Sequence, residues 1–119
     1  MGPADKRVAS AELYCGLVEV GVGLIPGAAG NLRVILHLTD DSLKKLSPFQ
    51  ISQKALETIG FAKVAMSASH AKKLHYLRPD DEIILNREHL LHRAKEAALE
   101  MVEDYQPPIL REDIKLAGK

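Results

Sequence analysis

The stretch Ala11–Arg33 reads AELYCGLVEVGVGLIPGAAGNLR. From Val18 to Gly30 it holds one carboxylate, Glu19, and is otherwise apolar, Gly, Ala or Pro. Valine and leucine alternate with Glu and Gly over Val18–Ile25, which predicts an extended segment with one face of bare backbone. Because Glu is rarely buried without a partner, Glu19 is either a functional carboxylate beside that backbone or a strand-edge residue that faces water.

The residues around this stretch predict short strands and several helices. Pro26–Gly30 is typical of a turn, and Asn31 is a candidate N-cap for the helix that follows. Ser47 and Pro48 have the residue types favoured where a helix begins. The expected elements are a short strand within Arg7–Cys15, the extended segment Val18–Ile25, helices that begin after Asn31, Ser47, Ser67 and Asn86, and a short strand at Ile83–Leu85.

Apolar spacing predicts which side of each helix faces the core. The expected inward residues are Leu32, Ile35, Leu36 and Leu38 in the first helix; Ala55, Leu56 and Ile59 in the second; Ala68, Ala71 and Leu74 in the third; and Leu90, Leu91, Ala94, Ala97, Ala98, Met101 and Val102 in the fourth.

Length and composition indicate one globular domain. The chain has 119 residues, 46% of them hydrophobic. Its 16 basic and 16 acidic residues give a net charge of zero, so neither nucleic acid nor an anionic membrane is an expected partner. Cys15 is the one cysteine, which favours an intracellular, cytoplasmic location. No apolar run approaches the ~20 residues of a membrane span, and the opening MGPADKR lacks the apolar core of a signal peptide.

No metal or nucleotide motif is evident. The GVGLIPGAAG segment, residues 21–30, lacks the GxGxxG spacing and carries no Gly-Lys-Ser/Thr, so it is neither a dinucleotide fingerprint nor a P-loop. Cys15 is expected to be a small buried residue rather than a nucleophile. The histidines form no HxH, HExxH or HxxxH pair, so no metal site is expected; they are His37, His70, His75, His89 and His92.

The opening stretch resembles the signature of the crotonase superfamily, the enoyl-CoA hydratases and isomerases. That pattern runs roughly F-G-x-P-E-x-x-x-G-x-x-P-G-x-G-G-x-x-R. Segments 57–81 and 105–108 add a likeness to the hydratase module of fused bacterial 3-hydroxyacyl-CoA dehydrogenases, so the resemblance spans about Arg7–Pro108. The residues in register are Gly16, Glu19, Gly23, Pro26, Gly27, Gly30 and Arg33.

The resemblance implies roles for particular residues. Glu19 matches the Glu that in hydratases acts with a second Glu on the attacking water, and that in several isomerases moves the proton. Gly27 matches the glycine whose N–H helps to hold that water, and Leu17 and Val18 fall among the residues that bind substrate and water. Ser67–Leu77 matches a helix beneath the site, with His70 where an acidic residue is usual.

The implied fold class is α/β, a partial crotonase ββα-spiral that is mostly helical in this chain. The family's two oxyanion donors and second Glu would lie upstream of Arg7, so the resemblance predicts the C-terminal part of one crotonase-like domain. Its expected divisions are a strand and active-site loop at 6–30, a helical part at 31–104 and an extended tail at 105–119.

The implied activity is hydration of trans-2-enoyl-CoA in fatty-acid β-oxidation, by a protein fused to a 3-hydroxyacyl-CoA dehydrogenase. Enoyl-CoA isomerisation and a catalytically inactive packing or oligomerisation piece are the alternatives. Acyl-CoA is then the substrate, hydration needs no cofactor, NAD belongs only to a fused dehydrogenase, and the parent protein is expected to be a homo-oligomer. The isolated chain is expected to be inactive.

Overall fold

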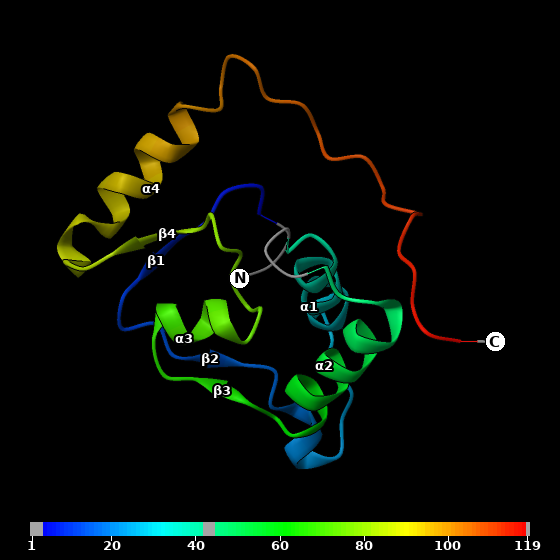
Figure 1. Cartoon of the computed structure of the whole chain (residues 1–119). Helices are drawn as coiled ribbons and strands as arrows, with labels where there is room; N and C mark the ends of the chain where they lie inside the picture. The colour runs from blue at the N-terminus through cyan, green and yellow to red at the C-terminus, as the bar shows by residue number, and fades with distance from the viewer. Residues whose placement is uncertain (1–3, 42–44, 119) are drawn as a thin grey trace.

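The computed structural model describes residues 4–41 and 45–118 (Figure 1). Two small sheets lie among four α-helices in these ranges, and the segment after residue 104 is extended. Strand β1 (Val8–Ser10) pairs in parallel with β4 (Glu82–Ile84), and β2 (Cys15–Gly16) pairs antiparallel with β3 (Val64–Ala65). The helices are η1 (Glu19–Val22), α1 (Gly30–Thr39), α2 (Pro48–Gly60), α3 (Ala68–Lys73), η2 (Arg87–His89) and α4 (Leu90–Leu99).

The predicted extended segment Val18–Ile25 is wrong, because its first residues form the 3₁₀ helix η1 instead. The chain satisfies its hydrogen bonds locally: Gly21 N–H donates to Val18 O, and Leu24 N–H donates to Glu19 O. Gly23 ends η1 with a left-handed φ of 77°, a conformation that glycine adopts without strain. The alternation of valine and glycine therefore does not mark a strand here.

Helix α1 begins two residues earlier than expected, at Gly30 rather than after Asn31. Its N-cap is Ala29, in the left-handed region with φ 61°, whereas the Asn31 side chain donates to Pro26 O at 3.2 Å. The predicted inward face is also shifted, since Leu32 is 43% exposed. The buried residues of α1 are Val34, His37 and Leu38.

The starts of α2 and α3 are confirmed. The Ser47 hydroxyl accepts from Gln50 N–H, and the Gln50 side chain accepts from Ser47 N–H, which completes a capping box. Ser67 accepts from His70 N–H in the same manner. In α2, however, Leu56 is 72% exposed, and the buried residues are Ile51, Ala55 and Thr58.

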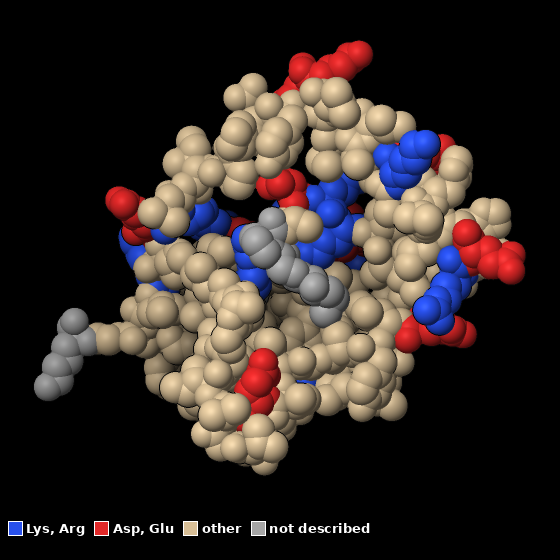
Figure 2. Space-filling model, turned by 180° about the vertical axis from the view of Figure 1, so that it is seen from behind, with Lys and Arg blue, Asp and Glu red and all other residues tan. Residues whose placement is uncertain are grey.

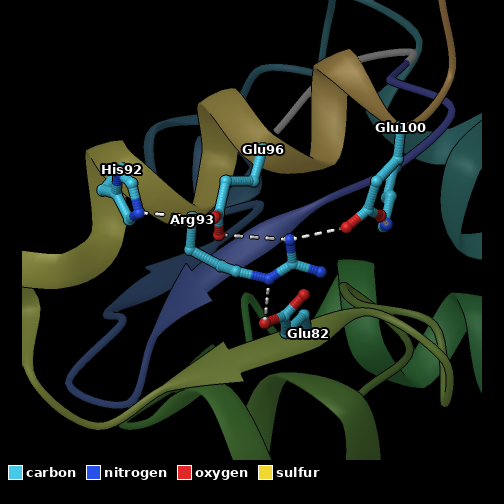
Figure 3. Close-up of polar contacts among 6 residues, drawn as sticks. Glu82, His92, Arg93, Glu96 and Glu100 are labelled. Carbon is cyan, nitrogen blue, oxygen red and sulfur yellow. Dashed lines mark hydrogen bonds and ion pairs between the residues drawn. The ribbon is translucent and has the colours of Figure 1, made fainter.

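Helix α4 does not bury the face predicted for it. Ala97 is its only buried residue, while Leu91 and Val102 are 82% and 68% exposed. Polar contacts hold this helix beside β4 instead. Arg93 forms ion pairs with Glu82 of β4, with Glu96 of α4 and with Glu100 at the end of α4 (Figure 3). Asn86, the expected cap, accepts from Glu88 N–H and caps the short η2 that precedes α4.

The core is small and rich in alanine, as three alanines from β3 and α3 have no measurable exposure. Beside it, the buried Arg7 donates two hydrogen bonds to Asp81 at 3.2 and 3.3 Å. No helix in the described ranges combines the length and hydropathy that crossing a membrane requires. The buried apolar cluster is Ala9, Val34, Leu38, Ile51, Ala55, Ala65, Ala68, Ala71, Tyr76 and Leu77.

Charged side chains are spread in small mixed groups on the rear face of the molecule, where Lys and Arg lie near Asp and Glu (Figure 2). The lower part of this face is mostly uncharged. In Figure 1 the lower part of the molecule holds η1, recognised by its blue colour, and the end of α2.

Candidate functional site

A cavity of about 280 Å³ lies where the residues after β2, the start of α1 and the end of α3 come together. It contains Glu19 and three glycines, so it joins a carboxylate to a wall of largely bare backbone. A larger cavity of about 500 Å³ lies between β1 and α4, but it lacks the glycine-rich wall. The residues that line the smaller cavity are Gly16, Leu17, Glu19, Gly27, Ala28, Gly30, Arg33, Val34, His75 and Tyr76.

Glu19 is the first residue of η1 and is half-buried. Its Oε2 atom is buried and accepts no hydrogen bond from any described residue. Buried carboxylate oxygens normally have a donor, so this atom has acceptor capacity for a water or a substrate group in the cavity. The same cavity receives Arg33, whose Nε is also buried without an acceptor in the described ranges.

The loop Pro26–Gly30 supplies Gly27, Ala28 and Gly30 to the cavity wall. Gly27 O accepts from Gly30 N–H at 3.0 Å, which closes a tight turn. A methyl group placed on Gly27 would meet nothing within 4 Å, so the space in front of this residue is open. The next two residues, Ala28 and Ala29, have left-handed φ values of 48° and 61°, and Ala28 adds a methyl group to the cavity wall.

Leu17 is fixed by close packing against Gly30. A Cβ on Gly30 would lie 2.6 Å from Leu17 Cδ2, a separation shorter than van der Waals contact. Glycine at this position therefore lets the leucine lie against the start of α1, and that contact forms one side of the cavity.

The end of α3 supplies His75 and Tyr76. His75 has φ 61°, and its carbonyl oxygen is 2.8 Å from His37 Nδ1 of α1. Burial raises the pKa of the Tyr76 hydroxyl, and the nearby Cys15 and Glu19 act in the same direction. Burial lowers the pKa of His37 and raises that of the Cys15 thiol, so both groups stay neutral near pH 7.

Three of the four residues predicted for the site line this cavity: Leu17, Glu19 and Gly27. Val18 does not line it, and its side chain is 48% exposed. Sequence reasoning gave no site role to His75 or Tyr76, which lie in the segment Ser67–Leu77 matched to a helix but follow the observed α3. No local sequence pattern marks these two residues, because they come close to the residues after β2 only in the folded chain.

The other histidines do not assemble a site. His70 Nδ1 accepts from Met66 N–H at 3.3 Å, and His89 and His92 are exposed on η2 and α4. No group of three or more His, Cys, Asp or Glu suited to a metal ion occurs in the portions of the chain with described coordinates.

Comparison with known proteins found no matching family model. The chain is 38% identical over 118 residues to a probable 3-hydroxyacyl-CoA dehydrogenase of Bacillus subtilis (strain 168), a match that covers 98% of this chain. The chain spans only 14% of that relative's length. The predicted resemblance to this kind of protein is therefore confirmed in sequence.

The fold comparison points the same way. Over 82% of its length the chain is similar to the crystal structure of an enoyl-CoA hydratase from Bacillus anthracis, with a TM-score of 0.57 and 24% identity. It covers 31% of that protein. The predicted fold class, a partial α/β crotonase fold, is thereby confirmed.

Proposed function

We propose that this chain is part of an enoyl-CoA hydratase module within a longer β-oxidation enzyme that also contains a 3-hydroxyacyl-CoA dehydrogenase. The observation that carries the proposal is Glu19, whose buried and unpartnered Oε2 lies in a glycine-walled cavity. The crotonase-type fold supports it, as does the relative named as a probable 3-hydroxyacyl-CoA dehydrogenase. A cytoplasmic location and homo-oligomeric assembly of the longer protein belong to the same proposal.

Hydration of a trans-2-enoyl thioester requires a base near the attacking water. Glu19 takes a proton from that water while the water oxygen bonds to C3 of the substrate. The electron pair of the double bond moves towards the thioester carbonyl, and C2 then accepts a proton from the carboxyl group of the second Glu, which another part of the longer protein would supply, to give the 3-hydroxyacyl thioester. Gly27, which also lines the cavity, is suited to hold the water because no side chain shields its backbone.

Exposed apolar residues on the segment after Glu19 fit an acyl chain. Val22, Leu24 and Ile25 lie three to six residues after Glu19 and are 78%, 63% and 83% exposed. Apolar side chains gathered on one segment favour an apolar ligand over a charged one. Fatty acyl-CoA thioesters are therefore the proposed substrates, and hydration needs no cofactor; NAD would serve the dehydrogenase part.

Isomerisation is the second candidate, and one observation favours it. Glu19 is the only carboxylate among the described residues that line the cavity, and one carboxylate suffices to move a proton between two carbons. Hydration would draw its second Glu and the oxyanion donors from another part of the longer protein. The isolated chain is accordingly proposed to have no turnover, since removing one oxyanion donor alone costs about 100- to 1,000-fold in kcat.

Replacing Glu19 by Gln in the longer protein tests the proposal. The amide keeps the shape of the side chain but cannot accept the proton, so kcat for hydration of crotonyl-CoA should fall by about 100- to 10,000-fold. If hydration is lost but 3-enoyl to 2-enoyl conversion is retained, Glu19 is the base for hydration and the isomerisation uses another base.

The matched control is Glu103→Gln, which changes an exposed glutamate beyond α4 and should leave both rates unchanged. NAD-dependent oxidation of a 3-hydroxyacyl-CoA by the same preparations reports whether the remainder of the protein is intact. Full hydratase activity in Glu19→Gln would refute the proposed role of this carboxylate.

A further inference from the structure

The hydroxyl of Tyr76 lies between the ends of β2 and β3. Its oxygen accepts from Leu17 N–H at 3.3 Å, and its proton is donated to Lys63 O at 2.6 Å. The side chain is 93% buried, as Tyr76 has 7% of its surface exposed. One hydroxyl therefore joins two backbone groups that are 46 residues apart in the sequence.

The register of the sheet places this hydroxyl at the end of the β2–β3 pairing. Cys15 lies opposite Ala65, and Gly16 lies opposite Val64, so the next pair along the ladder is Leu17 and Lys63. Leu17 and Lys63 lie just beyond the two-residue strands β2 and β3. The tyrosine hydroxyl links their backbones at this point, where the pairing of the two strands ends.

The β2–β3 pairing ends shortly before the candidate catalytic residue. Leu17 is the last residue whose backbone is tied to the β2–β3 sheet, and Glu19 begins η1 two residues later. The Leu17 side chain is packed against Gly30 at the start of α1. The backbone before η1 is therefore fixed on one side by the tyrosine and on the other by the α1 loop.

We propose that Tyr76 is a positioning residue for Glu19: its hydroxyl bridge holds the Leu17 backbone and thereby sets where Glu19 enters the cavity. This inference rests on the proposed function of Glu19. The hydroxyl proton is already committed to Lys63 O, so Tyr76 acts through the backbone rather than as a proton donor to substrate. The role falls to a residue that sequence reasoning did not single out.

The first test is Tyr76→Phe in the longer protein, with crotonyl-CoA as the substrate. The ring still fills its place in the core, but Leu17 N–H and Lys63 O lose their shared partner. We expect kcat to fall by about 10- to 100-fold, because a misplacement of about 1 Å in a catalytic group costs on the order of 100-fold. We expect KM to stay within about twofold, since the loss falls on the chemical step.

The matched control is Tyr14→Phe, which removes the hydroxyl of a tyrosine that is 66% exposed and lies on the same segment of chain. It should leave kcat and KM unchanged. A fall in kcat with little change in KM for Tyr76→Phe, but not for Tyr14→Phe, supports the proposal. An unchanged kcat in Tyr76→Phe overturns it.

The double variant separates positioning from a general structural effect. If Tyr76 acts through Glu19, adding Tyr76→Phe to Glu19→Gln should cause no further loss of rate. An equal fold-loss in both backgrounds would show that the hydroxyl acts independently of Glu19 and would overturn the inference.

Hydrogen exchange at Leu17 tests the bridge without reference to activity. In Tyr76→Phe the Leu17 amide should exchange faster than in the parent protein, while amides of α3 keep their rates. Unchanged exchange at Leu17 overturns the bridge, even if Glu19 proves catalytic. Faster exchange together with full activity of Glu19→Gln would retain the bridge as a structural fact, remove the proposed function, and so overturn the positioning role.

Discussion

Gly16 of β2 lies close to Lys63 and Val64 of the facing segment. A Cβ added to it would lie 2.9 Å from Lys63 O and 3.1 Å from Val64 Cγ2. The first of these contacts is with backbone, which cannot rotate away as a side chain would. Any side chain at this position must therefore push β3 away from β2.

We expect Gly16→Ala to lower the free energy of unfolding by about 1–3 kcal/mol, the usual cost of forcing an extra methyl group into a packed region. Urea titration of the longer protein would measure the change, with hydrogen exchange used to locate it in the β2–β3 sheet. Gly21→Ala is the matched control, because a Cβ there meets nothing within 4 Å. Equal stability of the two variants would contradict the close approach at Gly16.

The site could be predicted from sequence only in part, and the reason differs between residues. Glu19 and Gly27 belong to one short motif, so both could be predicted as site residues from the sequence. The fold places both in the lining of one cavity. Tyr76 is 59 residues from its partner Leu17, and no local pattern encodes such a contact. Its part in the site becomes visible only once β2, β3 and the end of α3 are assembled.

Among the helices, those whose starts are set by local side-chain chemistry were the predictable ones. Ser47 and Ser67 cap α2 and α3 as expected, since each hydroxyl bonds a backbone N–H three residues away. Helix η1 was not predicted because alternating valine and glycine is typical of a strand. In the structure the backbone hydrogen bonds of this segment are local and form a helical turn. The face of α4 was misjudged because amphipathic spacing does not specify what covers it.

The capping box of α2 allows a stability prediction. The hydrogen bonds at Ser47 and Gln50, at 3.3 and 2.9 Å, satisfy two N–H groups at the start of the helix. Ser47→Ala removes one of these bonds, and we expect a loss of about 1 kcal/mol in the free energy of unfolding, within a range of about 0.5–2 kcal/mol.

Chemical denaturation of the longer protein, read together with amide exchange in α2, would measure this loss. Ser69→Ala serves as the control, because Ser69 is exposed within α3 and caps no helix. Faster exchange confined to the first turn of α2 is the expected signature. An unchanged first turn would mean that Pro48 alone fixes the start of this helix.

Taken as a whole, the described chain is more open than a compact domain of its length. Its radius of gyration is 15.2 Å, against about 13.5 Å expected for 119 residues. The extended segment after residue 104 contributes to this difference, since it runs from α4 to the vicinity of α2, where Ala117 N–H donates to Ser52 Oγ (Figure 1). Large apolar side chains on α4 and on this segment are exposed; they include Leu91, Leu99, Val102, Ile109 and Leu110.

This exposure leads to a prediction for the isolated 119-residue chain. Contiguous apolar surface on a soluble monomer favours association, so we expect the isolated chain to self-associate as its concentration rises. Light scattering or sedimentation would detect the larger species. The matched relative is about seven times as long as this chain. We expect the longer protein to keep a fixed size over the same concentrations.

A matched pair of variants identifies the surface responsible. Leu91→Lys with Val102→Lys places charge on the exposed side of α4 and on the turn that follows it, where both side chains are largely solvated, and should shift self-association to higher concentration without lowering the urea midpoint. Lys54→Glu, an exposed position on α2, alters charge elsewhere and should leave association unchanged. Because the α4 variants remove apolar contact but no buried group, a monodisperse parent chain at every concentration would show that the exposed face of α4 does not drive contact between copies.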